Sequence, residues 1–181
     1  MIKSLPNLIS IYRLITIPFV AWFLLEGLYF YAAIFTLFIA ISDFLDGLIA
    51  RYFKVESELG SYLDAIADKA FVISIFILIG SLDLLPVFII ITVISRDIII
   101  MGSFLVAFMV GKKIGVKPTK ISKFNTFFQF CLVIATMLSN MNQYNEYFIE
   151  FRVNEILIFI VLICTILSLI NYINYWVKNI N

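Results

Sequence analysis

Apolar runs of about 20 residues alternate with short polar segments along nearly the whole chain. A helix needs about 20 apolar residues to cross the hydrocarbon core of a bilayer, so each run is long enough to span a membrane. The pattern predicts six spans, at Leu8–Leu25, Leu28–Ala50, Ser61–Ser81, Leu85–Val110, Lys123–Asn140 and Glu155–Val177. These spans use most of the chain, so residues 1–181 are predicted to form a single all-α membrane domain.

The composition agrees with an integral membrane protein. Hydrophobic residues make up 63% of the chain and charged residues only 14%, whereas roughly a quarter of the residues in soluble domains are charged. The chain has no histidine, which excludes imidazole ligands and imidazole bases. Cys131 and Cys164 fall in separate predicted spans, where we expect packing residues and no disulfide.

Lys and Arg residues concentrate in alternate segments between the predicted spans, which predicts the orientation of the chain. With a cytoplasmic N-terminus, the outer loops hold only Arg152, and the cytoplasmic segments hold Lys3, Arg13, Arg51, Lys54, Lys112, Lys113, Lys117, Lys120, Lys123 and Lys178. We therefore expect both termini inside. The chain starts almost at its first span without an Arg- and Ser-rich transit segment, which favours a bacterial inner membrane over an organelle.

Four aspartates lie next to two of the most apolar runs, in the stretch DFLDGLIARYFKVESELGSYLDAIAD. Asp43 and Asp46 are three residues apart, and Asp64 and Asp68 are four apart, so each pair lies on one helix face. The connection between the two spans, 52–59, is short and predicts antiparallel neighbouring helices. Both pairs are then expected at one depth, on the cytoplasmic side.

Such a cluster of carboxylates repels itself unless cations neutralise it. Oxygen ligands without His or Cys suit one or two Mg²⁺ or Mn²⁺ ions. The same acids also fit an ion or proton relay in a transporter, or structural pairing with Arg51, Lys69 or Arg96. A transporter predicts acids near the middle of the bilayer and an enzyme predicts them near its surface, and the spacing alone leaves these alternatives open.

The residues around the acids add a more specific pattern. Asp43-x-x-Asp46-Gly47-x-x-Ala50-Arg51, eight further residues, and Gly60-x-x-x-Asp64-x-x-x-Asp68 together resemble the signature of the CDP-alcohol phosphatidyltransferase family. The stretch LPNLISIYRL at Leu5–Leu14 is similar to the amphipathic N-terminal segment of these enzymes, and the order of six spans is similar along essentially the whole chain. The resemblance implies the fold of that family.

The resemblance also implies residue roles. A phosphatidyl group would pass from CDP-diacylglycerol to an alcohol acceptor with release of CMP, in a homodimer with one site in each chain. Mg²⁺ or Mn²⁺ would be held by Asp43, Asp46, Asp64 and Asp68, with Asp68 also the general base. The cytidine nucleotide would be held by Asn7, Gly47, Ala50, Arg51 and Gly60.

Two further stretches, VISRDIII and VKPTKISKFNTFFQ, bear on the acceptor. By resemblance, the acceptor pocket is expected at Arg96, Ser122, Lys123, Thr126 and Gln129. For Arg96 the alternative is a buried pair with Asp97, which we disfavour because adjacent helix positions do not face one another. The alternative for Lys112, Lys113 and Lys117 is a basic loop attracted to anionic lipid.

Departures from one branch of the family predict the acceptor itself. Enzymes that use glycerol-3-phosphate commonly carry Glu after the arginine and the motif GKxKT, whereas this chain has Asp97 and SKFNT. Both features are more similar to eukaryotic-type cardiolipin synthases, whose acceptor is phosphatidylglycerol. A neutral Asn125 in place of a lysine fits the lower charge of a phosphodiester. We expect cardiolipin synthesis, with phosphatidylglycerophosphate synthesis as the alternative and an ion or proton transporter as a distant one.

Overall fold

A computed structural model describes residues 5–53, 58–109, 120–141 and 152–180 of the chain. Within these ranges, side chains are described for residues 12, 14–42, 69–103, 121–141 and 152–177. The described residues form helices and turns without a strand, which confirms the all-α class. The helices are α1 (Leu5–Leu25), α2 (Tyr29–Phe53), α3 (Glu58–Ser81), α4 (Val87–Met109), α5 (Lys120–Ser139) and α7 (Val153–Ile180).

The helix bounds agree closely with the predicted spans. Every end lies within three residues of the position predicted from hydropathy, because the apolar runs and the helices end at the same polar and turn residues. The stretch Leu5–Leu14 forms the first turns of α1 and is continuous with the first predicted span, so among the described residues it is not a separate amphipathic helix.

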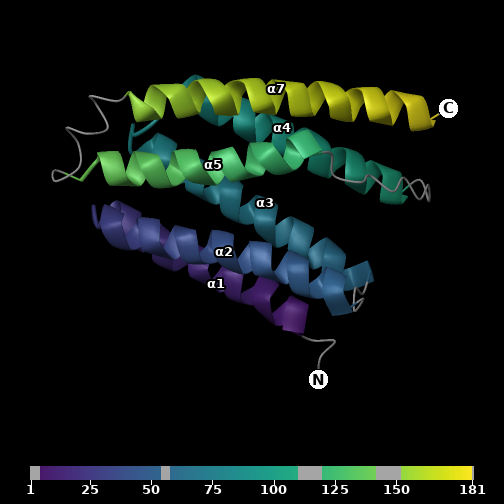
Figure 1. Cartoon of the computed structure of the whole chain (residues 1–181), viewed down its shortest axis with the longest axis horizontal. Helices are drawn as coiled ribbons and strands as arrows, with labels where there is room; N and C mark the ends of the chain where they lie inside the picture. Colours follow the sequence, from purple (N-terminus) through teal and green to yellow (C-terminus); the bar gives the residue numbers. More distant parts are fainter. Residues whose placement is uncertain (1–4, 54–57, 110–119, 142–151, 181) are drawn as a thin grey trace.

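The six helices make a ring of contacts, in the order α1, α2, α5, α7, α4, α3 and back to α1. In Figure 1 the N-terminal helices α1 and α2 lie at the bottom, α3 lies between, and α5 and α7 lie at the top. Within the described residues α2 contacts α1 and α5, and α3 contacts α1 and α4. The pairing of α2 with α3 near their connection stays a prediction.

The direction of the helices places the chain ends together. Both termini, the end of α2 and the start of α3 lie toward the right of Figure 1, and the α1–α2 turn lies toward the left. Gly27 closes that turn with a backbone φ of 71°, and its N–H donates to the carbonyl oxygen of Leu24 at 3.1 Å. Asp83 takes the same left-handed conformation after α3, with a φ of 54°.

The exterior of the bundle carries many large apolar side chains, and several polar side chains are buried in its interior. Large apolar side chains are exposed on all six helices, for example Phe19, Phe38, Ile77, Ile91, Phe127 and Phe159. Among the described side chains, the buried polar ones are Thr16, Thr36, Arg96, Asp97, Asn125, Gln129, Thr136, Ser139, Thr165 and Ser168. An apolar exterior around a partly polar interior is the arrangement expected of helices in lipid.

Length and composition alone identify fewer spans than the sequence predicts. Among the side chains that the structure describes, two helical stretches are long and apolar enough to cross a bilayer, Ile121–Ser139 and Val153–Val177. Leu14–Leu25, Tyr29–Ser42 and Lys69–Ser81 are apolar but shorter. Each of these three stretches has one end at the limit of the described side chains.

A buried apolar cluster lies toward one end of the bundle. It draws Val20, Ile39, Phe76, Ile89, Leu132 and Val161 from the six helices, toward the α1–α2 and α3–α4 turns. The buried ionic side chains Arg96 and Asp97 lie at the middle of α4.

Candidate active site

The four motif aspartates all lie in helical backbone. Asp43 and Asp46 lie in the second half of α2, and Asp64 and Asp68 lie in the first half of α3. Since the end of α2 and the start of α3 lie at the same end of the bundle (Figure 1), the fold brings the two acidic segments to one end. Their side chains lie outside the described part of the structure, so the metal site stays a prediction.

The residues expected to hold the nucleotide lie at this same end. Asn7 belongs to the first turn of α1, Gly47, Ala50 and Arg51 to the last turns of α2, and Gly60 to the first turn of α3. Their side chains too lie outside the described residues. Because α1 contacts both α2 and α3, it joins the two acid-bearing helices and carries Asn7 on the same support.

Arg96 and Asp97 form a buried ion pair at the middle of α4. Their side chains are 1% and 0% exposed, and Arg96 Nη1 donates to Asp97 Oδ1 at 2.5 Å. The sequence interpretation disfavoured this pair and was wrong on that point. The long arginine side chain can curl back to its neighbour, and an unpaired charge is costly inside the bundle.

Two more helices contribute to the same polar cluster. Lys69 of α3 donates from Nζ to Asp97 Oδ1 at 2.8 Å, so one carboxylate oxygen receives two cations. Arg96 Nη2 donates to Ser122 Oγ of α5 and to Ser168 Oγ of α7, both at 2.6 Å. We call Lys69, Arg96, Asp97, Ser122 and Ser168 the charged network. It joins four helices, and it brings together two of the expected acceptor residues, Arg96 and Ser122.

The other expected acceptor residues lie farther around or along α5. Lys123 is exposed. Thr126 is half-buried, and its Oγ1 donates to the carbonyl oxygen of Ser122 at 3.2 Å, which occupies its hydroxyl hydrogen within the helix. The structure thus joins Ser122 to Arg96 and Thr126 to Ser122, and it leaves Lys123 at the surface.

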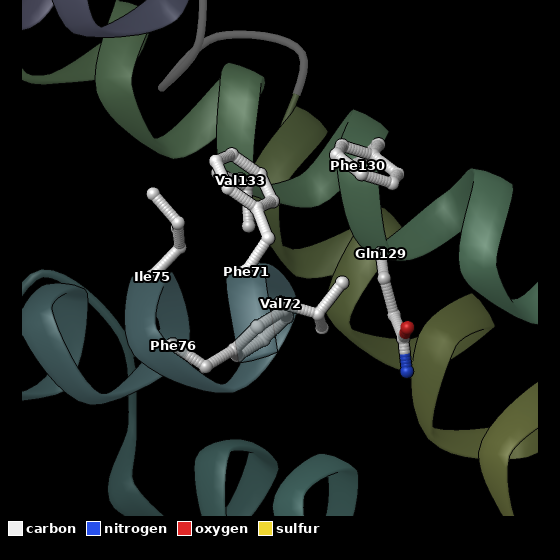
Figure 2. Close-up of a pocket in the computed structure, with 7 residues that line it drawn as sticks. All are labelled: Phe71, Val72, Ile75, Phe76, Gln129, Phe130 and Val133. Atoms are coloured by element: carbon white, nitrogen blue, oxygen red, sulfur yellow. The ribbon is translucent and has the colours of Figure 1, made fainter. Parts of the chain in front are cut away.

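Gln129 borders a small recess between α3 and α5, with a cavity volume of about 10 Å³. Figure 2 shows its amide at one edge of a mostly apolar lining, which comprises Phe71, Val72, Ile75, Phe76, Gln129, Phe130 and Val133. Gln129 is 1% exposed, and within the described structure neither its oxygen nor its nitrogen has a hydrogen-bond partner. A buried amide without partners costs stability unless a water molecule or a ligand binds it.

Two polar residues of α7, Thr165 and Ser168, were not expected to take part. Asn125 is fully buried and accepts a hydrogen bond at its Oδ1 from Thr165 Oγ1 at 2.8 Å, and Ser168 binds Arg96 as described above. Thr165 and Ser168 lie in α7, among strongly apolar residues. Their spacing of three residues places them on one helix face, and a polar pair in an otherwise apolar span is the signal that could have found them.

Comparison with known proteins identifies the class. The sequence matches the CDP-alcohol phosphatidyltransferase family over residues 3–171, and the chain belongs to that family. It is therefore an enzyme of a membrane-bound family, which confirms the resemblance based on the aspartate motif and sets aside the transporter alternative.

Particular relatives divide between two names. The chain is 33% identical over 147 residues to a CDP-diacylglycerol–glycerol-3-phosphate 3-phosphatidyltransferase of Aquifex aeolicus, which covers 78% of this chain and 80% of the relative. It is 32% identical over 146 residues to a probable cardiolipin synthase (CMP-forming) of Drosophila melanogaster, which covers 78% of this chain and 44% of that relative. A chloroplastic glycerol-3-phosphate enzyme of Oryza sativa is 34% identical over 152 residues, with 46% of its length covered. The chain spans less than half of these two eukaryotic relatives.

Proposed function

We propose that the chain transfers the phosphatidyl group of CDP-diacylglycerol to phosphatidylglycerol, which forms cardiolipin and releases CMP. The observation that carries this choice of acceptor is the neutral Asn125, fully buried and hydrogen-bonded to Thr165. It stands at the position where the glycerol-3-phosphate branch commonly has a lysine. A phosphodiester carries less negative charge than a phosphomonoester, so an acceptor pocket for phosphatidylglycerol needs fewer cations.

Phosphatidylglycerophosphate synthesis is the alternative, and the names of some relatives support it. The glycerol-3-phosphate enzyme of Aquifex aeolicus is covered over most of its length, and a second bacterial enzyme of that name, from Cereibacter sphaeroides, is 34% identical over 148 residues. The two reactions share the donor and the leaving group. They differ in the acceptor that meets Arg96 and Ser122.

We infer that Asp43, Asp46, Asp64 and Asp68 hold one or two divalent cations at the end of the bundle. All four ligands are carboxylates, a donor set that suits Mg²⁺ or Mn²⁺. The bound metal would neutralise charge on the phosphate oxygens of the donor and of the departing CMP. Asn7, Gly47, Ala50, Arg51 and Gly60 would hold the nucleotide, since α1, α2 and α3 carry these residues to the same end.

The acceptor would bind on the α4–α5 side of this site. Arg96 and Ser122, with Lys123 and Thr126 on the adjoining turns of α5, would orient the phosphate of the acceptor. Asp68 would accept the proton of the attacking hydroxyl. The hydroxyl oxygen then bonds to the phosphorus next to the diacylglycerol, and the bond from that phosphorus to the oxygen of CMP breaks.

We further propose a six-span arrangement with both termini in the cytoplasm and the acidic end at the cytoplasmic face of a bacterial inner membrane. The Lys and Arg distribution supports this orientation. So does the location of the chain ends and the acid-bearing helix ends on one side of the bundle (Figure 1). A homodimer is implied by the resemblance and stays a prediction.

The decisive experiment identifies the lipid product. Purified protein in mixed micelles receives CDP-diacylglycerol, Mg²⁺ and either phosphatidylglycerol or glycerol-3-phosphate, and mass spectrometry follows the lipids while CMP is quantified. We expect cardiolipin with the first acceptor and little product with the second. Phosphatidylglycerophosphate as the main product would establish the alternative. In a parallel arm EDTA should stop CMP release and Mg²⁺ or Mn²⁺ should restore it, and turnover that persists in EDTA would contradict the metal assignment.

A further inference from the structure

In the charged network, the two carboxylate oxygens of Asp97 differ in their hydrogen bonds. Its Oδ1 receives both Arg96 Nη1 at 2.5 Å and Lys69 Nζ at 2.8 Å. Within the described structure, its Oδ2 has no partner although the side chain is fully buried. A pair that served stability alone would be expected to use both carboxylate oxygens, because a buried charge is stabilised by satisfying every lone pair.

The guanidinium of Arg96 is divided between partners in a corresponding way. One terminal nitrogen binds Asp97, and the other reaches Ser122 Oγ and Ser168 Oγ, both at 2.6 Å. A two-pronged arginine–carboxylate contact would occupy two guanidinium nitrogens with the carboxylate. Here Asp97 holds one terminal nitrogen, Ser122 and Ser168 hold the other, and Nε has no partner within the described structure. Asp97 is the charged group among these partners, so it gives the strongest of the contacts that orient the guanidinium.

Lys69 connects this arrangement to the acidic motif. It follows Asp68 directly in α3, and its side chain is 19% exposed where it meets Asp97. The helices that carry the motif do not include α4, so the Lys69–Asp97 contact is a direct side-chain link from the α3 segment of Asp68 to the helix of Arg96. A shift of Asp97 would move both cations that it holds.

We propose that Asp97 is a positioning residue for acceptor binding. Its carboxylate sets the direction of the Arg96 guanidinium toward Ser122 and holds α4 to the segment of α3 that carries Asp68. Asp97 acts through Arg96 and Lys69, without contact to the reacting atoms. The inference rests on the proposed function, because it takes Arg96 and Ser122 as acceptor residues.

The test compares steady-state kinetics of wild type, Asp97→Asn, Asp97→Glu and the exposed control Glu155→Gln. Glu155 pairs with Arg152 at 3.1 Å with both side chains more than 60% exposed, so its loss removes an ion pair far from the network. For Asp97→Asn we expect an acceptor KM raised about 10-fold or more. The KM for CDP-diacylglycerol should change less than about 2-fold. Asp97→Glu should recover most of the acceptor KM, and Glu155→Gln should match wild type.

A double variant keeps the test valid if Asp97→Asn is too unstable to purify. Asp97→Asn leaves two cations close together without the carboxylate that they shared, and Lys69→Met removes one of them. We expect Asp97→Asn/Lys69→Met to fold and to keep the raised acceptor KM, because the guanidinium is still released from Asp97.

The outcomes separate this inference from the proposed function. Unchanged acceptor KM in Asp97→Asn or in the double variant, whatever happens to kcat or thermal stability, would overturn the positioning role while wild type still makes cardiolipin. Wild-type protein that transfers to neither acceptor would overturn the proposed function, and the inference with it.

Discussion

Gln129 and Asn125 lie four residues apart in α5, and both have buried amide atoms without a partner in the described structure. Gln129 lacks partners at both amide atoms, whereas Asn125 lacks one only at its nitrogen. A buried polar group without a hydrogen bond costs stability. Residues that cost stability at the edge of an apolar recess are typical of binding sites, where a ligand supplies the missing bonds.

The Gln129→Leu variant should separate the stability cost of the buried amide from its role in binding a ligand. Leucine removes the unsatisfied amide and keeps an apolar side chain, so the free energy of unfolding should rise by about 1–3 kcal/mol. The KM for phosphatidylglycerol should rise as well, because the resemblance places Gln129 in the acceptor pocket. Thermal unfolding of the purified protein in detergent and acceptor kinetics would measure the two quantities. Lower stability in Gln129→Leu would mean that the amide is already satisfied, for example by water.

Substitutions of the four motif aspartates should lower the rate of CMP release, whereas substitution of an aspartate outside the motif should not. Asp43→Asn, Asp46→Asn, Asp64→Asn and Asp68→Asn should each lower the rate of CMP release at least about 100-fold, because each removes a negative metal ligand or the general base. Asp83→Asn is the matched control, since Asp83 is exposed in the turn after α3, away from the acidic end. A motif variant with the rate of this control would have no part in the mechanism.

At the scale of the helices, the turns after α1 and after α3 each contain one residue in the left-handed backbone conformation. The two residues differ in their side chains. Gly27 takes a φ of 71° after α1, with open space around its α-carbon, and Asp83 takes a φ of 54° after α3. Glycine takes this conformation without strain, and other residues pay a steric cost. Exchanges at the two turns should therefore change stability in opposite directions.

We expect Gly27→Ala to lower the free energy of unfolding by about 1 kcal/mol, and Asp83→Gly to raise it by about 0.5 kcal/mol. Thermal unfolding in detergent would compare both with wild type. CMP release should be unchanged, since both turns lie at the end of the bundle away from the acidic motif. If Asp83→Gly lowers stability instead, the Asp83 side chain contributes a contact that outweighs the relief of strain.

Hydropathy predicted where each helix begins and ends, because the length of an apolar run is a local property of the chain. It could not predict which helices contact one another around the ring, since packing depends on contacts between distant segments. The same limit applies to the site. The aspartate spacing identified the motif, but Ser168 lies 72 residues from its partner Arg96, and only the fold brings them together. The rule against adjacent pairs failed at Arg96 and Asp97 because arginine is long enough to reach its neighbour.

At the scale of the whole molecule, the alternating helix directions predict which residues share a membrane face. Lys123 and Glu155 are both exposed and lie at the starts of α5 and α7, which run in opposite directions (Figure 1). In a variant with Cys131 and Cys164 replaced by alanine, Glu155→Cys should react with a membrane-impermeant maleimide in spheroplasts. Lys123→Cys should react only after the membrane is opened. The reverse pattern would invert the proposed orientation, and labelling of both in intact spheroplasts would contradict six spans.

The ring of contacts has a consequence for how such enzymes diversify. Helices α1, α2 and α3 form one continuous arc of the ring and carry all four motif aspartates, and α4, α5 and α7 form the other arc, which carries Arg96 and Ser122. Among the described residues, the main contacts between the arcs are those of α2 with α5 and of α3 with α4. In the proposed site, donor chemistry and acceptor choice would therefore reside in consecutive halves of the chain. A descendant could exchange its alcohol substrate by mutation in the second half alone, provided that the Lys69–Asp97 bond across the α3–α4 border is inherited intact.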